Sequence, residues 1–136
     1  MHTFELLPEA EGARVKAVGS TRAALLEAAL QGMFAAAAPR YADPERPVER
    51  PFAVKSVDFP ALLVDFLDQA LSRSDANREA YRTVRFDLVT GDEAKGAFIG
   101  AAADGFEMRI KAASRGGLAI GKNEEGNWET AVTLET

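Results

Sequence analysis

The sequence predicts an α+β fold, in which a largely antiparallel or mixed β-sheet carries two amphipathic helices on one face. Two apolar repeats at helical spacing lie in the first half of the chain, and short alternating segments separated by turn residues fill the second half. A helix with one apolar stripe has one face to bury, so we expect both helices to cover the same side of the sheet. The 136 residues suffice for one core, which predicts a single domain over residues 1–136.

The chain opens with two predicted strands and a helix. Residues 4–7 and 14–18 alternate between apolar and polar side chains, which indicates strands on either side of a loop. Thr21 is a suitable N-cap for the first helix, and Pro39 ends it. The apolar residues at helical spacing are Leu25, Leu26, Ala29, Leu30, Met33, Phe34 and Ala37.

The middle of the chain contains a proline-rich segment and the second helix. Four prolines among charged residues in 39–51 predict a surface connection, which is followed by a strand over 52–57. Asp58 is the expected N-cap of the helix, with Pro60 in its first turn. The buried stripe of this helix is predicted to consist of Leu62, Leu63, Phe66, Leu67, Ala70 and Leu71.

The last third of the chain is predicted to be β-structure. Glycine, aspartate and asparagine separate its alternating segments, and residues 124–127 have the composition of a hairpin turn between the last two of them. The strands are expected at 83–89, 96–102, 107–113, 118–122 and 128–134.

The composition limits the compartment and the partners. There are 21 acidic and 16 basic side chains, a formal charge of −5, which argues against a surface that grips nucleic-acid backbone over its whole extent. Any RNA contact should be local or shared with a partner, and we expect no DNA partner. The absence of cysteine and of a long apolar run predicts a cytoplasmic protein without a membrane partner.

Catalytic motifs are largely absent from the sequence. His2 is the only histidine and precedes the first strand, so a serine triad or a histidine-based zinc site is not expected. Gly116, Gly117 and Gly121 lack the following Gly-Lys-Ser/Thr of a phosphate-binding loop, and the aspartates lack the spacing of a calcium loop. We therefore expect no independent catalysis, and a metal-dependent hydrolase is the weakest alternative.

Two groups of carboxylates could share a divalent cation. Glu9 and Glu11 lie in the loop after the first strand, and Glu135 precedes the terminal carboxylate of Thr136. If the fold brings the loop and the C-terminus together, their oxygen atoms suit Ca²⁺ or Mg²⁺. The alternative is that these acids are exposed at frayed ends and repel one another.

A set of basic residues could contact phosphate or an acidic partner. Arg85, Arg109, Lys111 and Arg115 alternate with apolar residues and would lie on the sheet face opposite the helices. The alternative is that these are the ordinary charged residues of a half-exposed sheet, because no aromatic residues are interleaved with them.

The order of these features resembles the archease family along almost the whole chain. Residues 4–8 (FELLP) and 13–19 (ARVKAVG) are similar to the opening of that family, and 28–34 (AALQGMF) and 62–67 (LLVDFL) to its two helices. Lys111-Ala112 and the tail 128–135 continue the resemblance.

The resemblance implies an α+β fold and an accessory role. Archeases assist the GTP-dependent RNA ligase of the RtcB kind, which joins tRNA halves in splicing and repairs broken RNA. It also implies a divalent ion, often calcium, held by acidic residues of the opening loop and the C-terminal end. By this resemblance Glu135, Glu11 and Glu9 are candidate metal ligands, and Lys111 and Arg109 are candidate contacts to partner or phosphate.

Several positions depart from the family pattern. The opening loop of the family reads H-T-A-D, whereas this sequence has Glu9 in place of the histidine and Gly12 in place of the aspartate. The expected acid after the first helix falls at Pro39, and the expected histidine after Lys111-Ala112 falls at Gly116. Only Glu135 is a chemically similar successor. The alternative function is therefore a binding or scaffold module that keeps the fold without metal binding or ligase activation.

Overall fold

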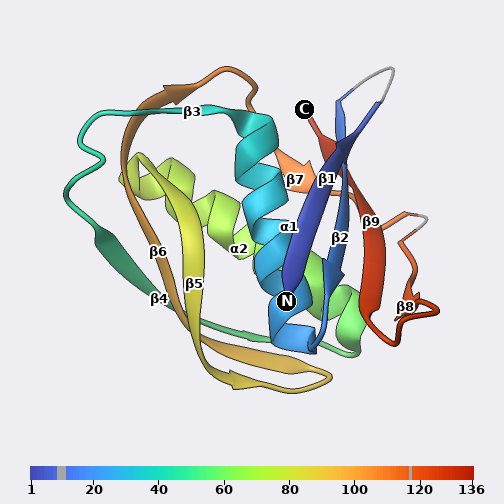
Figure 1. The fold of residues 1–136 in the computed structure, drawn as a ribbon. Helices are drawn as coiled ribbons and strands as arrows, with labels where there is room; N and C mark the ends of the chain where they lie inside the picture. The colour runs from blue at the N-terminus through green and yellow to red at the C-terminus, as the bar shows by residue number, and fades with distance from the viewer. Residues whose placement is uncertain (9–11, 117) are drawn as a thin grey trace.

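The structure, a computed structural model, describes residues 1–8, 12–116 and 118–136, and in them two antiparallel sheets enclose the helices (Figure 1). The first sheet has the order β1-β2-β9-β7, with β8 also paired to β9; in the second, β6 pairs with β3, β4 and β5. The first sheet comprises β1 (His2–Leu7), β2 (Ala13–Gly19), β7 (Ala112–Ala113), β8 (Ile120–Lys122) and β9 (Trp128–Glu135). The second comprises β3 (Pro39–Tyr41), β4 (Val48–Lys55), β5 (Glu79–Val89) and β6 (Glu93–Phe106).

The predicted α+β fold with two helices and antiparallel pairing is confirmed, and the structure adds that the strands divide into two sheets. Helix α1 (Arg22–Ala37) contacts β1 and β2 on one side and β5 on the other (Figure 1). The expectation that α1 covers one sheet face with a single apolar stripe is therefore wrong, because the helix packs against both sheets. Its buried residues surround the helix axis: Leu25, Leu26, Ala28, Ala29, Leu30, Gly32, Met33, Phe34 and Ala37. A helix that is apolar on all sides is stable only when layers cover it on all sides.

The approach of α1 to β2 is close enough to exclude a side chain at Gly32. A Cβ atom built on Gly32 would overlap Cγ1 of Val15 and lie 3.2 Å from Cβ of Phe4. Val15 is 1% exposed at the centre of β2. The glycine thus lets the helix backbone rest directly on the strand, which places α1 at a fixed distance from the first sheet.

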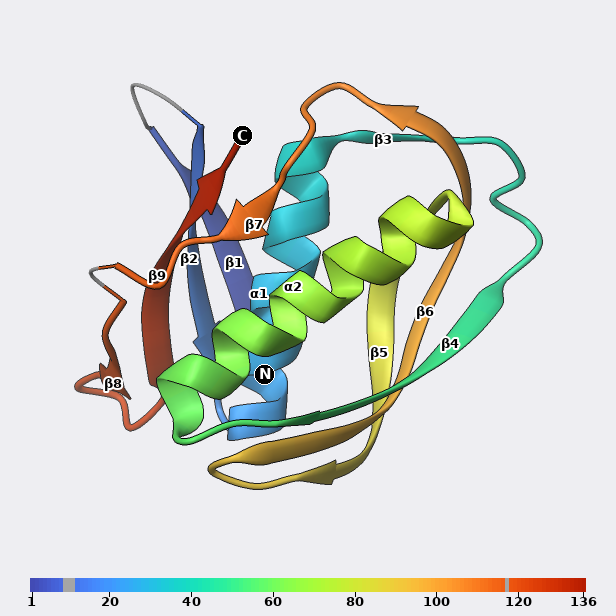
Figure 2. The ribbon, with the colours of Figure 1, turned by 180° about the vertical axis from the view of Figure 1, so that it is seen from behind.

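Helix α2 (Phe59–Asn77) covers the second sheet and reaches the first. Its N-cap Asp58 accepts a hydrogen bond from the Ala61 N–H at 2.9 Å, and proline stands in its first turn, as the sequence predicts. One face packs on β4, β5 and β6, and the helix also contacts β7 (Figure 2). Within the described residues, neither helix combines the length and the apolar composition needed to cross a lipid bilayer.

Part of the proline-rich segment forms strands, so the prediction of a surface connection over 39–51 is only partly right. β3 begins at Pro39, and β4 begins at Val48 and includes Pro51. Pro51 is tolerated because β4 pairs with β6 alone, so one of its edges needs no hydrogen-bond donor.

The predicted strand over 107–113 is wrong except at its end. β6 continues to Phe106, and of the predicted segment only Ala112–Ala113 form a strand, β7. The Glu107 N–H donates to the Ala38 carbonyl and the Met108 N–H to the Ala37 carbonyl, both at 3.1 Å. These amides satisfy carbonyl groups at the end of α1 instead of joining a sheet. Residues 107–111 are called the β6–β7 connection below.

A buried carboxylate links the two outer strands of the second sheet across β6. Glu79 is 3% exposed and accepts hydrogen bonds from Arg50 at 2.8 and 2.5 Å and from the Tyr81 hydroxyl at 3.0 Å. The Ser74 hydroxyl donates to the Glu79 carbonyl. The hydrogen bonds from Arg50 hold the pKa of the Glu79 carboxyl below its usual value despite burial. The ion pair therefore joins β4 to β5, and the hydrogen bond from Ser74 fixes α2 to the start of β5.

Gly32→Ala should destabilise the protein because the added methyl group cannot fit against Val15. Overpacking costs about 1–3 kcal/mol, and the better helix propensity of alanine offsets about 1 kcal/mol, so we expect a net loss of about 1–2 kcal/mol in the free energy of unfolding. Urea denaturation measures it. Gly121→Ala, which meets no atom within 4 Å, is the control and should stay within about 0.5 kcal/mol. Unchanged stability of Gly32→Ala would show that α1 lies farther from β2.

Glu79→Gln should lower the free energy of unfolding at pH 7 by about 3 kcal/mol, because it breaks a buried ion pair. Since the folded-state pKa of Glu79 is lowered, its stabilisation is complete above the unfolded-state pKa of about 4.3 and is lost as pH falls through the folded-state pKa. The difference between wild type and variant should thus be constant above about pH 5 and shrink in acid. Urea denaturation at a series of pH values tests this, with the exposed Glu49→Gln as control. A difference that persists unchanged in acid would contradict the assignment.

Candidate functional site

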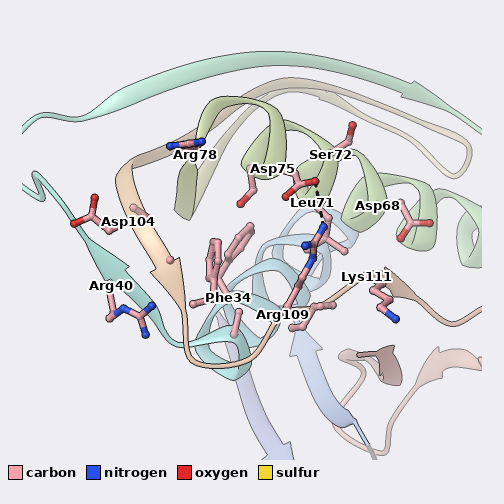
Figure 3. A pocket seen from close by; sticks show the side chains of 16 residues that line it. Phe34, Arg40, Asp68, Leu71, Ser72, Asp75, Arg78, Asp104, Arg109 and Lys111 are labelled. Atoms are coloured by element: carbon pink, nitrogen blue, oxygen red, sulfur yellow. Dashed lines mark ion pairs between the residues drawn. The ribbon is translucent and has the colours of Figure 1, made fainter.

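A pocket of about 600 Å³ lies between the C-terminal half of α2, the end of β6 and the β6–β7 connection (Figure 3). Its floor is apolar and its rim is charged. The floor residues include Phe34, Ala37, Leu71, Ala103, Phe106 and Ile110. The charged residues are Arg40, Arg78, Arg109 and Lys111 with Asp68, Asp75 and Asp104.

The end of α1 anchors the wall of the pocket that carries Arg109 and Lys111. Ala38, the C-cap of α1, has φ of 50°, and its N–H reaches the carbonyls of Phe34 and Ala35. The two amides of the β6–β7 connection then bond to the last carbonyls of the helix. At its far end the Lys111 N–H donates to the Glu135 carbonyl at 2.7 Å. The connection is therefore held at both ends, which fixes where its two basic side chains begin.

The four cations of the rim differ in their partners. Arg109 Nη2 lies 3.7 Å from Asp75 Oδ2 across the mouth of the pocket, and both side chains are more than 70% exposed (Figure 3). Arg40 pairs with Glu107 at 3.0 Å. For Arg78 and Lys111 no ion pair is found with any described residue. These exposed ion pairs contribute little to stability and can exchange for other anions.

Asp68 stands where the pocket meets the C-terminal end of the chain. Its Oδ1 accepts a hydrogen bond from the Ala113 N–H at 2.8 Å. Burial raises the pKa of the Asp68 carboxyl, and the negative charges of Asp65 and Glu135 raise it further, although the Ala113 N–H and Arg115 oppose them. Asp68 and Glu135 are thus close enough for their charges to interact.

Arg78, which lines the pocket, and Ala38, which follows the lining residue Ala37, adopt a left-handed backbone conformation. Ala38 and Arg78 have φ of 50° and 54°, and among the described residues they are the non-glycine residues with positive φ. Each caps a helix C-terminus, where glycine is the usual residue. The left-handed conformation costs about 1–2 kcal/mol for a residue with a Cβ atom. Such strain is common at functional sites.

The structure brings several of the predicted site residues together. Arg109 and Lys111 both line the pocket. The side chain of Glu135 is exposed at the end of β9, one residue from the position paired with Ala13 of β2. A Cβ atom on Gly12 would lie 2.7 Å from the Leu134 carbonyl oxygen. Gly12, the residue directly before β2, therefore lies against the end of β9.

The metal hypothesis itself stays a prediction. Glu9 and Glu11 lie outside the described residues. In residues 1–8, 12–116 and 118–136, no three acidic, histidine or cysteine side chains gather closely enough to hold a metal ion. The hypothesis therefore depends on Glu135 together with two residues of the opening loop.

The predicted basic strip does not form as a single surface. Arg85 pairs with Glu49 at 3.2 Å and Asp87 at 3.5 Å on β5, and Arg115 pairs with Asp65 of α2. Neither residue lines the pocket beside Arg109 and Lys111. The strip was predicted from strand alternation, and the β6–β7 connection is not a strand.

Two further cations of the site, Arg40 and Arg78, were not predicted from the sequence. Arg40 is the second residue of β3 and lies over Gly105, where a Cβ atom would come 2.6 Å from its Nη2. Arg78 follows α2 at a position where a glycine would be the ordinary cap. Arg78 directly follows α2, whereas Arg40 lies three positions after the end of α1, so no common sequence pattern predicts them.

Comparison with known proteins identifies the family. The model of the Archease protein family matches residues 4–135. The chain belongs to the archease family. No protein of curated function matches the chain.

Two solved structures have the same fold as this archease-family chain. A crystal structure of an archease from Thermotoga maritima, described as a possible chaperone, is 15% identical, with a TM-score of 0.68 over 96% of this chain and 94% of that one. The solution structure of protein 1598 from Methanobacterium thermoautotrophicum is 22% identical, with a TM-score of 0.71 over 98% of each chain. At these identities the likeness establishes the fold and not the activity.

Proposed function

We propose that this protein is an accessory factor that activates or assists a GTP-dependent RNA ligase of the RtcB kind, in tRNA splicing and RNA repair in the cytoplasm. Membership of the archease family over residues 4–135 supports the proposal. The observation that carries it is that Gly12, the end of β9 and the basic pocket are adjacent, because the pocket residue Lys111 donates its N–H to the Glu135 carbonyl.

The chemistry of the pocket suits binding better than catalysis. Ser72 and Ser74 line it, but the chain has no histidine besides His2, and Ser74 donates its proton to the Glu79 carbonyl. Among the described residues, no hydrogen bond joins either serine to a carboxylate of the pocket that could act as a general base. Arg109 and Lys111 are exposed and can bind phosphate oxygens or acidic side chains of a ligase. The chain would then act through contact, without a reaction of its own.

A divalent cation, Ca²⁺ or Mg²⁺, is part of the proposal. Carboxylate oxygens are the donors that these ions prefer, and Asp68 accepts the N–H of Ala113, whose strand position pairs with the last residues of β9 beside Glu135. Glu135, Glu11 and Glu9 would hold the ion, which would supply positive charge toward RNA or ligase phosphate.

The second candidate function is a binding or scaffold module of archease fold without metal binding or ligase activation. Gly12 and Pro39 favour it, because neither has a side chain that can ligate an ion, and Gly12 lies directly against the C-terminal strand. The two experiments below separate these functions.

Addition of the protein to its cognate ligase should increase multiple-turnover joining of broken tRNA halves. Arg109→Gln and Lys111→Gln should weaken the activation about tenfold each if their cations contact phosphate or carboxylate. Arg73→Gln, an exposed cation of α2 outside the pocket, is the matched control and should activate like wild type. Absence of any acceleration with an active cognate ligase would remove the activation proposal and leave the scaffold function.

Calorimetric titration with CaCl₂ and MgCl₂ should show binding that Glu135→Gln weakens at least about tenfold, because one carboxylate ligand is lost. Glu125→Gln, in the hairpin turn between β8 and β9, changes the net charge equally at a remote position and should bind like wild type. Flat titrations at millimolar ion would refute the metal site.

A further inference from the structure

The pocket behind Arg109 has the properties of a small-molecule site in addition to those of a contact surface. Its volume of about 600 Å³ lies within the range of ligand pockets, and it has an apolar floor with a few charged groups around it. We propose that this pocket binds a phosphorylated nucleoside, either as a free nucleotide or as the terminal nucleotide of an RNA strand.

The floor offers an apolar, partly aromatic surface for a nucleobase. Phe106 is half-buried, and its ring centroid lies 6.4 Å from that of Phe34 at an angle of 37°. Leu71 from α2 and Ile110 from the β6–β7 connection line the same cavity (Figure 3). Flat bases stack on such surfaces without sequence preference, because every base has an apolar face.

The rim offers cations for a phosphate group. In Figure 3, Arg40 and Arg78 lie on one side of Phe34, and Arg109 and Lys111 on the other. These four cations face three carboxylates, and Asp68 among them already accepts the Ala113 N–H. The contact between Arg109 and Asp75 is long and exposed, so a phosphate with two charge-assisted hydrogen bonds would displace Asp75.

The backbone of Arg78 gives an independent argument. Glycine would relieve the left-handed strain at this helix cap, yet the chain places there a residue with a long cationic side chain. The side chain reaches the rim of the pocket, and no ion pair to it is found in the described part of the chain. A bound phosphate would give this arginine the anionic partner that accounts for its position.

The inference rests on the proposed function in one respect: the bound nucleotide would be what the accessory protein presents to the ligase. Binding by the chain alone, with no ligase present, tests it separately. Failure of nucleotide binding would leave ligase activation open, and failure of activation would leave nucleotide binding open.

The test is titration of the ¹⁵N-labelled protein, followed by amide chemical shifts. The probes are adenosine and guanosine 5′-monophosphate, the two nucleosides, inorganic phosphate, and an RNA octamer with and without a 3′-phosphate. The monophosphates or the phosphorylated octamer should shift the amides of residues 71–78 and 103–111, and each should bind at least about fivefold more tightly than nucleoside or phosphate alone. Monophosphate binding assigns a free nucleotide as the source, whereas binding of the phosphorylated octamer alone assigns an RNA end.

Charge variants should change the affinity in opposite directions. Arg109→Gln should weaken nucleotide binding about tenfold, and Asp75→Asn should strengthen it, because Asp75 no longer competes for Arg109. Arg73→Gln on the same helix should leave it unchanged.

Arg78→Gly separates binding from folding. It should weaken nucleotide binding about tenfold while it raises the midpoint of thermal unfolding by about 3 °C or more, because glycine relieves the positive φ. Ala38→Gly relieves the same kind of strain without removal of a cation, so it should raise the midpoint and leave the affinity unchanged. Equal binding of nucleoside and nucleotide, equal binding of phosphate alone, or no shift at millimolar nucleotide and RNA would each overturn the inference.

Discussion

The contact between α1 and the first sheet determines how the rest of the molecule is arranged. Because Gly32 has no side chain, the helix backbone rests on Val15, and the opposite side of the same helix is then free to receive β5. One helix in this way forms the core for both sheets. Its alanine-rich end is narrow, and it stops at Ala38 where the chain turns into β3. The pocket lies at this end of the helix, so the position of the site is a consequence of that packing.

The sequence predicts local structure well where a residue acts through its immediate neighbours. Thr21 and Asp58 cap the helices as expected, and the hairpin between β8 and β9 has Gly126 with φ of 79° at its turn. The alternating segments do not predict that the strands divide into two sheets. The nearly uniform apolar character of α1 is the one indication, because such a helix must be buried on all sides. The segment 107–113 alternates like a strand, but its amides bond to the end of α1, a contact between residues about 70 positions apart.

The candidate site was predicted only in part, for related reasons. Arg109 and Lys111 were selected as members of a strand face, and they reach the pocket from an irregular connection. Arg40 and Arg78 line the same pocket because the C-terminal ends of α1 and α2 both lie beside it. No local sequence pattern predicts that the two helix ends come together. Gly12 lies against Leu134, next to Glu135, because β2 pairs with β9, a register that the sequence does not specify. Individual side chains could thus be chosen from the sequence, whereas their grouping depends on tertiary contacts.

The family relationship depends on the apolar core, whereas the expected departures from the family pattern concern residues that could bind a ligand. The apolar contacts that define the fold are present over the whole matched range, so the fold of the archeases is kept at an identity of 15–22% to the two solved structures. Of the expected departures, Gly12 lies directly before β2 in the first sheet, and Pro39 begins β3 in the second. A fold of this kind can therefore exchange one binding chemistry for another without loss of its core.

The hydrogen bonds from Glu107 and Met108 to the last carbonyls of α1 have a mechanical consequence. The segment that carries Arg109 is joined at one end to the central helix and at the other, through Lys111, to the strand that closes the first sheet. A displacement of that segment would therefore lengthen hydrogen bonds to both layers of the protein. The last turn of α1 and the end of β9 are thus joined through the short segment that carries both basic side chains.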